Sequence, residues 1–298
     1  MRVLITGGGG FFGSAIVQKF LGHGDHLTII SRSKPNAVHL GISYYYADIT
    51  RPKTLQNIKG TYDVLVHSAA HMPKSPKADD PRMLVKTNIL GTLNVMERLA
   101  PYAKKIIYVS SIDVYGGIQR GNNPLTESSE TTPRSYYGVS KLSGEQISQI
   151  YCQKQHIPLT ILRFTVLYGP GDVIDRAIPN FIQHAIAGTP LIVPRIKILR
   201  DYLAIREAAR AVYVAALSPK NGTYIIGSGK SFDVKKVAKT IHARIRSKSP
   251  IISKSSGQAQ FQVLLNVQKA QKDFHFTPRP FPFGLEETAG WYKARLRK

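Results

Sequence analysis

The chain has 298 residues, of which 43% are hydrophobic, and its formal net charge is +23. This hydrophobic content supports a large folded core, which excludes a chain that is disordered throughout. No apolar run is long enough to span a bilayer, and the first residues show no secretory leader, so we expect a cytoplasmic protein without a membrane segment. Cys152 is the single cysteine, so no internal disulfide can form, which fits a reducing compartment.

The positive charge is spread along the chain. The densest basic stretches lie at 195–200 and 235–254, and neither interleaves aromatic residues as a platform for single-stranded nucleic acid does. A field of this sign attracts polyanions. Because the charges are scattered, they indicate a solvated basic surface, and we expect that nucleic-acid binding is not the main function.

Short apolar runs typical of strands alternate with helical patterns through the first part of the chain. In chain order we expect a strand at 3–6, a helix at 14–21, strands at 26–30, 43–46 and 64–67, a helix at 81–99, a strand at 105–110, a helix at 136–153 and a strand at 159–163. Such alternation is typical of a parallel sheet covered by helices on both faces. The sequence therefore predicts an α/β fold with a Rossmann-type doubly wound parallel sheet.

The pattern changes after residue 168, where Gly169, Pro170 and Gly171 form a break. The segments that follow are shorter and more mixed. We expect a main domain over residues 1–168 and a smaller lobe over 169–298, part of which returns to the main sheet. Since doubly wound sheets bind ligands at the carboxyl ends of their strands, a lobe over that edge would close a substrate cleft.

A glycine-rich loop joins the first strand to the first helix, with Gly7, Gly10 and Gly13 at intervals of three residues. Glycines allow a tight turn and a close approach of the backbone to a pyrophosphate, and the helix N-terminus adds N–H groups and partial positive charge. The position of this loop predicts a dinucleotide site, to which Phe11 and Phe12 belong.

The end of the second strand carries Ser31 and Arg32 and no acidic residue. An acid at this point bonds the ribose 2′-hydroxyl of NAD, whereas an arginine can hold the 2′-phosphate of NADP through charge-assisted hydrogen bonds. Arg32, together with Ser31 or Ser33, therefore favours NADP, and NAD stays possible.

Two further strand ends offer contacts to a dinucleotide. Asp48 and Ile49 follow the third strand, where the carboxylate could bond the adenine amino group and Ile49 could pack on the ring. Ser68, Ala69 and Ala70 follow the fourth strand, where small residues let the backbone approach a ribose.

Tyr137 and Lys141 stand four residues apart in a helical pattern, which puts both side chains on one face. An ammonium close to a phenol favours the phenolate and so makes the tyrosine a usable acid or base. Ser111 follows the preceding strand, where its hydroxyl could orient a substrate oxygen. The three residues together predict proton exchange at an alcohol or ketone beside the dinucleotide.

With these motifs in view, the chain resembles the extended short-chain dehydrogenase/reductases, the NAD-dependent epimerase/dehydratase family. Residues 6–13 are similar to the family's Thr-Gly-x-x-Gly-x-x-Gly motif, 108–116 to its catalytic-serine strand and 135–141 to its Tyr-x-x-x-Lys segment. Segments at 224–229 and 284–292 resemble its closing segments, so the likeness covers nearly the whole chain. The resemblance implies a catalytic triad of Ser111, Tyr137 and Lys141, with Lys141 also holding the nicotinamide ribose.

The resemblance implies further contacts. Asn88 matches the family's helix asparagine, and Phe164 and Val166 lie in the strand that passes the nicotinamide. Ser110 shares the end of the catalytic-serine strand and is expected at the cofactor. Arg200, in an Arg-Asp-Tyr segment, resembles an arginine that meets a nucleotide-sugar diphosphate. The expected substrate contacts are Ser111, Tyr137 and Arg200.

The chain departs from the family pattern on the substrate side. Val166 and Ile225 stand where the family often has asparagine, and residues 194–197 replace a usual Gly-Asp-Gly turn. The 4,6-dehydratase branch has Asp-Glu after its serine or threonine, whereas this chain has Ile112 and Asp113. These differences argue against an active dehydratase of that type and leave the substrate less defined than the cofactor.

Two outcomes use this machinery on a nucleotide-linked sugar, the substrate class that the resemblance implies. A retained cofactor that returns hydride to the other face gives an epimerase, whereas an exchangeable NADPH gives a keto-reductase. Arg32 and the short chain favour the reductase, and the motif set favours the epimerase. Chemistry on another small ketone, alcohol or hydroxysteroid stays open. So does a non-catalytic dinucleotide sensor or RNA-binding relative, against which the intact triad argues.

The resemblance also implies a homodimer, in which the long helix after Pro81 and the helix with Tyr137 pair across a two-fold axis. The residues themselves show only that these helices are long. Cys152 has no partners at a metal-ligand spacing, so we expect no metal site.

Overall fold

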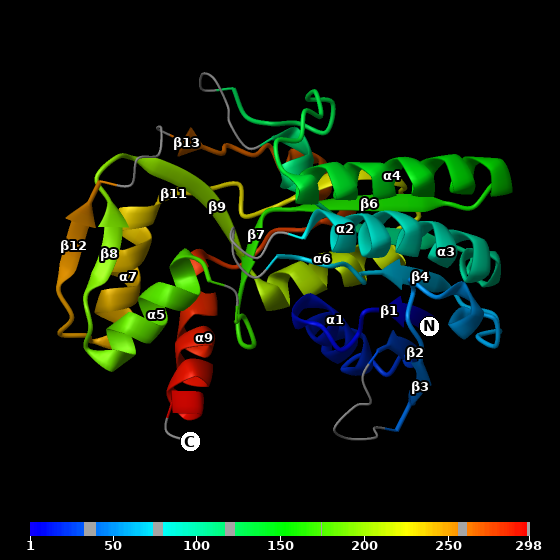
Figure 1. Cartoon of the computed structure of the whole chain (residues 1–298), viewed down its shortest axis with the longest axis horizontal. Coiled ribbons are helices and arrows are strands. Elements are labelled where there is room, and N and C mark those ends of the chain that lie inside the picture. The colour runs from blue at the N-terminus through cyan, green and yellow to red at the C-terminus, as the bar shows by residue number, and fades with distance from the viewer. Residues whose placement is uncertain (33–39, 74–79, 117–122, 174, 256–260, 297–298) are drawn as a thin grey trace.

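A seven-stranded parallel sheet forms the centre of the molecule (Figure 1). The structure is a computed structural model, and it describes residues 1–32, 40–73, 80–116, 123–173, 175–255 and 261–296. The strands of the sheet are β1 (Arg2–Thr6), β2 (His26–Ser31), β3 (Ile42–Tyr46), β4 (Val64–His67), β5 (Ile106–Ser111), β6 (Leu159–Phe164) and β10 (Gly222–Ile226). They follow the order β10-β6-β5-β4-β1-β2-β3, and every neighbouring pair is parallel. This confirms the predicted doubly wound sheet.

The direction of the winding reverses at β1. From this strand the chain builds outward through β2 and β3 on one side and through β4, β5 and β6 on the other. Thr6, the last residue of β1, pairs with Ile30 of β2 and with His67 of β4, so the carboxyl ends of these strands meet at one edge. The crevice at such a switch point is where doubly wound sheets bind ligands.

Helices cover both faces of the sheet (Figure 1). One face packs on α1 (Phe11–Leu21), α6 (Ile205–Leu217) and α8 (Gln268–Phe274), and the other on α2 (Pro81–Leu84), α3 (Gly91–Arg98) and α4 (Tyr136–Gln155). The strands are apolar on both sides because successive side chains alternate between the two cores. In β1, Val3 and Ile5 join the core under α1 and α6, whereas Leu4 joins the core under α3.

The helices begin and end close to the predicted positions. The first helix begins at Phe11, earlier than predicted, because the glycine loop leads directly into it. The helix predicted at 81–99 consists of α2, a π-helical turn at Val85–Leu90 and α3. Ser135 begins α4, since its Oγ accepts a hydrogen bond from the N–H of Gly138 at 3.0 Å. Short 3-10 helices occupy Pro52–Leu55, Ala100–Tyr102 and Ile112–Tyr115.

A second, smaller core lies beside the carboxyl edge of the sheet. Its helices are α5 (Ala177–Ala187), α7 (Val234–Ile245) and α9 (Phe281–Leu296), and its strands are β7 (Val166–Tyr168), β8 (Leu191–Pro194), β9 (Ile198–Ala204), β11 (Ser231–Asp233), β12 (Ile251–Lys254) and β13 (Phe261–Gln262). The chain beyond residue 168 also returns to the main sheet, because β10 pairs with β6, and α6 and α8 pack on it. The two cores are therefore interleaved along the sequence.

Candidate active site

The glycine loop turns at the carboxyl end of β1 in a conformation that side chains would obstruct. Gly7 has a φ of +74°, and a Cβ on it would lie 2.6 Å from the Cα of Ala69. A Cβ on Gly13 would lie 2.0 Å from the carbonyl oxygen of Gly7. Gly10 precedes the first turn of α1 and provides no side-chain cap, so the N–H groups of that turn are available to a ligand.

A cavity of about 670 Å³ opens from this loop along the carboxyl edge of the sheet. It brings together nearly all of the residues that the sequence predicts for the cofactor and for the proton chemistry. Those that line it are Gly7, Gly10, Phe11, Phe12, Gly13, Ser31, Arg32, Asp48, Ile49, Ser68, Ala69, Ala70, Ser110, Ser111, Tyr137, Lys141, Phe164 and Val166. These residues come from the carboxyl ends of β1 to β6, from the first turn of α1, from β7 and from α4, which explains how segments so far apart in the sequence meet.

The two remaining predicted residues lie elsewhere. Asn88 is 1% exposed and outside the cavity lining, and its amide bonds the backbone of His71 and the Oγ of Ser140. It therefore holds the loop after β4 against α4 instead of facing the cavity. Arg200, on β9, lines a second cavity of about 690 Å³ in the smaller core.

The two cavities join. Both are lined by Met72, Asp113, Val166, Leu167 and Arg176, so a molecule in the second cavity can reach the end of the first. Tyr137 and Ser111 line the first cavity together with Asp113, near this junction. The arrangement places proton-exchanging groups between a long cavity on the sheet and a separate cavity in the smaller core.

The expectation that Lys141 favours the phenolate of Tyr137 is wrong, because the surroundings of Tyr137 raise its pKa and keep the hydroxyl protonated. Removal from water in the cavity wall raises the pKa of Tyr137, and the carboxylate of Asp113 raises it further, while the Arg176 guanidinium opposes both effects. Burial lowers the pKa of Lys141 to about 7, and the carboxylate of Glu145 works against this reduction. A protonated phenol next to a lysine that titrates near neutral pH is suited to giving a proton to a carbonyl oxygen.

Asp113 and Arg176 are charged residues at the junction that the sequence-based site prediction does not include. Desolvation raises the pKa of Asp113, whereas the charges of Arg200 and Arg176 and the Ser111 hydroxyl lower it. Arg176 is held by Asp172, which accepts from its Nη2 at 2.9 Å and from its Nε at 3.2 Å. Asp113 follows the serine motif directly, which could have suggested it, but no local pattern marks Arg176.

The far end of the first cavity carries opposite charges. Arg32 and Asp48 both line it. Burial would raise the pKa of Asp48, but the hydrogen bond from the N–H of Thr50 and the charges of Arg32 and Arg51 lower it below its usual value. Ser33, a predicted companion of Arg32, lies outside the described residues. This end therefore has a cation and a hydrogen-bond acceptor for a polar ligand group.

The lining fits an extended dinucleotide. Gly9 and Gly10 line the cavity just before α1 begins, where the N–H groups of the first turn can meet a pyrophosphate. Ile49 and Asp48 lie toward one end of the cavity, and Phe164, Tyr137 and Lys141 toward the other. These distributions match an adenosine half at the first end and a nicotinamide half at the second.

A model of the NAD-dependent epimerase/dehydratase family matches residues 3–227 of the chain. The chain belongs to this family. Among curated relatives, it is 25% identical to the dTDP-glucose 4,6-dehydratase of Neisseria meningitidis, covering 98% of this chain and 93% of that protein. It is 27% identical to the putative UDP-glucose 4-epimerase of Methanocaldococcus jannaschii, covering 99% of each chain.

Solved structures of epimerases have the same fold as this chain. The UDP-glucose 4-epimerase of Thermotoga maritima, solved with UDP-glucose, has a TM-score of 0.88 and 23% identity, covering 99% of this chain and 100% of that chain. The UDP-glucuronic acid 4-epimerase of Bacillus cereus, solved with UDP-glucuronic acid and NAD, has a TM-score of 0.85 and 24% identity, with the same coverage. Among the residues of this chain that the structure describes, no helix is long and apolar enough to cross a membrane.

Proposed function

We propose that this protein is an NAD(P)-dependent epimerase or keto-reductase that acts on a nucleotide-linked sugar by hydride transfer. The observation that carries the proposal is the convergence of Ser111, Tyr137 and Lys141 on one cavity with the glycine loop. Three segments distant in sequence meet there in the arrangement that alcohol–ketone chemistry beside a dinucleotide needs.

Each residue of the triad has a role that follows from its chemistry. The Ser111 hydroxyl orients the reacting oxygen of the substrate, and the Tyr137 hydroxyl exchanges a proton with it. Lys141 binds the ribose of the nicotinamide half and supplies positive charge beside the tyrosine. When bound, the dinucleotide supplies the hydride or accepts it.

The second cavity is the proposed place for the nucleotide part of the substrate. Arg200 and Arg176 line it, and guanidinium groups suit the diphosphate that links a nucleotide to a sugar. The junction of the cavities leaves the sugar next to Tyr137. The names of the relatives support this substrate class, since they act on dTDP-linked or UDP-linked sugars.

For the cofactor, we propose NADP as the favoured dinucleotide, with NAD as the alternative. The support is Arg32 in the cavity wall at the end of β2, where no acidic residue ends the strand. The NAD in the Bacillus cereus epimerase structure favours the alternative. NADP accompanies the reductase form of the proposal, and retained NAD accompanies the epimerase form.

The test is to incubate the purified protein with UDP-glucose, UDP-glucuronic acid and dTDP-glucose in the presence of NAD⁺ or NADP⁺, and with their 4-keto derivatives in the presence of NADPH or NADH. Products are followed by NMR and the reduced cofactor by absorbance. Interconversion of two epimers without net loss of cofactor identifies an epimerase, and stoichiometric consumption of NADPH by a keto sugar identifies a reductase. If every one of these substrates stays unchanged with both cofactors, the proposed function is wrong.

We also propose that the protein forms a homodimer through the layer of α2, α3 and α4. Several large apolar side chains of this layer are exposed, namely Val85, Leu90, Leu93, Val139 and Ile150. Their burial against a second copy would remove apolar surface from water, which drives association.

A further inference from the structure

Glu145 is a buried carboxylate on the same helix as the proposed catalytic residues. It stands one turn after Lys141 and two turns after Tyr137 on α4, so the three side chains follow one face of the helix. Glu145 is only 1% exposed. A charge removed from water in this way needs partners of matching geometry, and its surroundings provide them.

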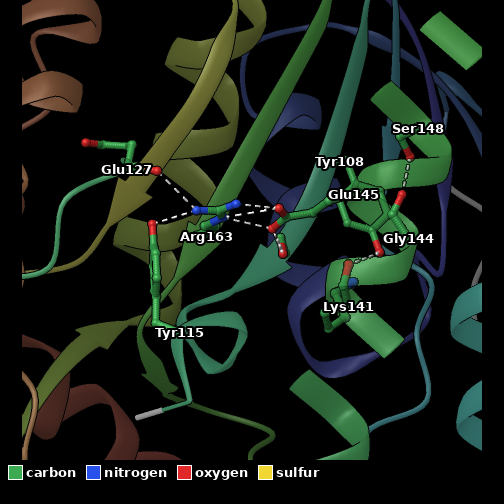
Figure 2. Close-up of polar contacts among 9 residues, drawn as sticks. Tyr108, Tyr115, Glu127, Lys141, Gly144, Glu145, Ser148 and Arg163 are labelled. Carbon is green, nitrogen blue, oxygen red and sulfur yellow. Dashed lines mark hydrogen bonds and ion pairs between the residues drawn. The ribbon is translucent and has the colours of Figure 1, made fainter. Parts of the chain in front are cut away.

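Arg163, on β6, is the main partner of Glu145 (Figure 2). Its Nε donates to Oε1 of Glu145 at 3.0 Å, and its Nη2 donates to Oε2 at 2.6 Å. The Oγ of Ser110 donates a further short hydrogen bond to Oε1. Ser110 is the second-last residue of β5 and lines the proposed cofactor cavity, so the carboxylate of Glu145 contacts the wall of that cavity from behind.

Arg163 extends the contact to other segments. Its Nη1 donates to the hydroxyl of Tyr115 at 2.7 Å and to the carbonyl oxygen of Glu127 at 3.4 Å. The carboxylate of Glu127 in turn accepts from the N–H of Ile225, on β10, at 2.9 Å. The Glu145–Arg163 pair thus joins α4 to β6, and Ser110 and Glu127 connect the pair to β5 and β10. Figure 2 shows the contacts of Arg163 with Glu145, Tyr115 and Glu127.

A second contact fixes α4 at the same level. The hydroxyl of Tyr108 lies so close to the helix that a Cβ on Gly144 would be 2.0 Å from it. The ring of Tyr108 lies against the Lys141 ammonium, with 4.4 Å from Nζ to the ring centre. Tyr108 therefore contacts both Lys141 and the turn of α4 that carries Glu145.

We propose that Glu145 is a positioning residue, which fixes α4, with Lys141 on it, and Ser110 at the cofactor cavity. This inference rests on the proposed function, because it concerns the lysine that the proposed chemistry uses. A buried ion pair alone gives little stability over an apolar pair of the same shape, so stability does not account for its placement behind the site.

The titratable groups around Lys141 set its pKa. Tyr137 and Glu145 lie on its own helix, His67 lies on β4 and Tyr108 on β5. The pKa of His67 is lowered to about 3 by burial and by the Lys141 charge, so the imidazole is neutral. Within this set, the Glu145 carboxylate is the group that raises the pKa of Lys141 against the effect of burial.

The experiment measures the binding of NADH and of NADPH by fluorescence as a function of pH, in wild type and in four variants. Lys141→Met shows which step of the pH dependence belongs to the lysine. Glu145→Gln removes the carboxylate charge, and Glu145→Asp keeps it. Ser148→Ala is the matched control, since Ser148 is a fully buried side chain one turn further along α4 that bonds the Gly144 carbonyl and carries no charge.

In Glu145→Gln, we expect the midpoint of the Lys141-dependent step to move about one pH unit lower. Glu145→Asp should return about half of this shift, and Ser148→Ala should keep the wild-type midpoint even where thermal unfolding shows a loss of stability. If Glu145→Gln does not fold, the midpoint of Glu145→Asp is compared instead, and a displacement of about half a pH unit is expected because the shorter carboxylate lies further from the lysine.

A wild-type midpoint in Glu145→Gln, or in Glu145→Asp where that variant stands in for it, would show that the ion pair only supports the fold, and it would overturn the proposal. A pH-dependent step that persists in Lys141→Met would also overturn the proposal. The readout needs no sugar substrate. Failure of the proposed function can therefore be distinguished from failure of this inference. In that case wild type shows no turnover of sugar substrates, but the midpoints of cofactor binding still shift in the variants.

Discussion

The Lys141 ammonium lies over the ring of Tyr108, with Nζ 4.4 Å from the ring centre. An aromatic face attracts a cation, but this contact does not replace the water that the ammonium loses in a site where Lys141 is 3% exposed. Burial consequently lowers the pKa of Lys141 to about 7. The residue titrates in the range where an enzyme works.

The first prediction concerns pH. Lys141 is charged below a pKa of about 7 and neutral above it, so any step that needs the ammonium weakens as the pH rises through that value. We expect kcat/KM, which reports the free enzyme, to fall on the alkaline side of about pH 7. The pH profile of wild type checks this. A rate that stays level from about pH 6 to pH 9 would contradict a role for the charged lysine.

The second prediction tests the proton donor with two adjacent tyrosines. Tyr137→Phe removes the hydroxyl that lines the cavity and should lower kcat by about 10²- to 10⁴-fold while cofactor binding stays close to wild type. Tyr136→Phe is the control, because Tyr136 is exposed on the same turn of α4 and is not part of the cavity lining. Steady-state kinetics and fluorescence titration measure both. Equal activities in the two variants would remove Tyr137 from the mechanism.

The third prediction addresses the choice of dinucleotide. Loss of charge-assisted hydrogen bonds to a 2′-phosphate costs about 1.5–3 kcal/mol, so Arg32→Ala should weaken NADPH binding by about 10- to 150-fold and leave NADH nearly unchanged. Arg51→Ala is the control, since Arg51 also lowers the pKa of Asp48 but does not line the cavity. Fluorescence titration gives the six dissociation constants, for NADPH and NADH with each of the three proteins. Tighter binding of NADH than NADPH in wild type would favour the epimerase form of the proposal.

The fourth prediction uses two glycines with opposite surroundings. Gly13→Ala forces a Cβ to within 2.0 Å of the Gly7 carbonyl oxygen, so we expect a loss of about 1–3 kcal/mol in stability together with much weaker dinucleotide binding. Gly290 lies in α9 with nothing within 4 Å of its Cβ position. Gly290→Ala should instead raise stability by about 0.5–1 kcal/mol. Chemical denaturation compares them, and a Gly13→Ala protein as stable as wild type would show that the loop adjusts.

The fifth prediction concerns assembly. Leu90→Glu places a charge on the exposed side of the α2–α4 layer and should convert a dimer into a monomer, because a charge at an apolar contact would have to be buried without a partner. Leu217→Glu is the matched control, since Leu217 is similarly exposed but ends α6 on the other face of the sheet. Sedimentation velocity distinguishes the states. A monomeric wild type would mean that the proposed dimer does not form. A dimer that only Leu217→Glu disrupts would place the interface on the other face of the sheet.

The sequence by itself determined the features that depend on neighbours along the chain. The strand at Arg2–Thr6, the glycine turn at Gly7 and the helix with Tyr137 and Lys141 follow from local periodicity and turn chemistry, and each lies where the pattern predicts. The spacing of four residues also placed Tyr137 and Lys141 on one side of a helix, and both line the same cavity. Parallel strands then bring their carboxyl ends to one edge, which is why strand-end residues were found so readily.

The tertiary structure decided which way side chains turn once elements far apart in the sequence pack together. Asn88 was expected at the cofactor but bonds His71 and Ser140, because the packing of the loop after β4 on α4 needs its amide. Arg176 meets the same cavity as Tyr137 only because the smaller core folds over the sheet edge. Glu145 and Arg163 pair across α4 and β6. Burial, and the charge interactions that burial strengthens, depend on such long-range contacts, and no local pattern encodes them.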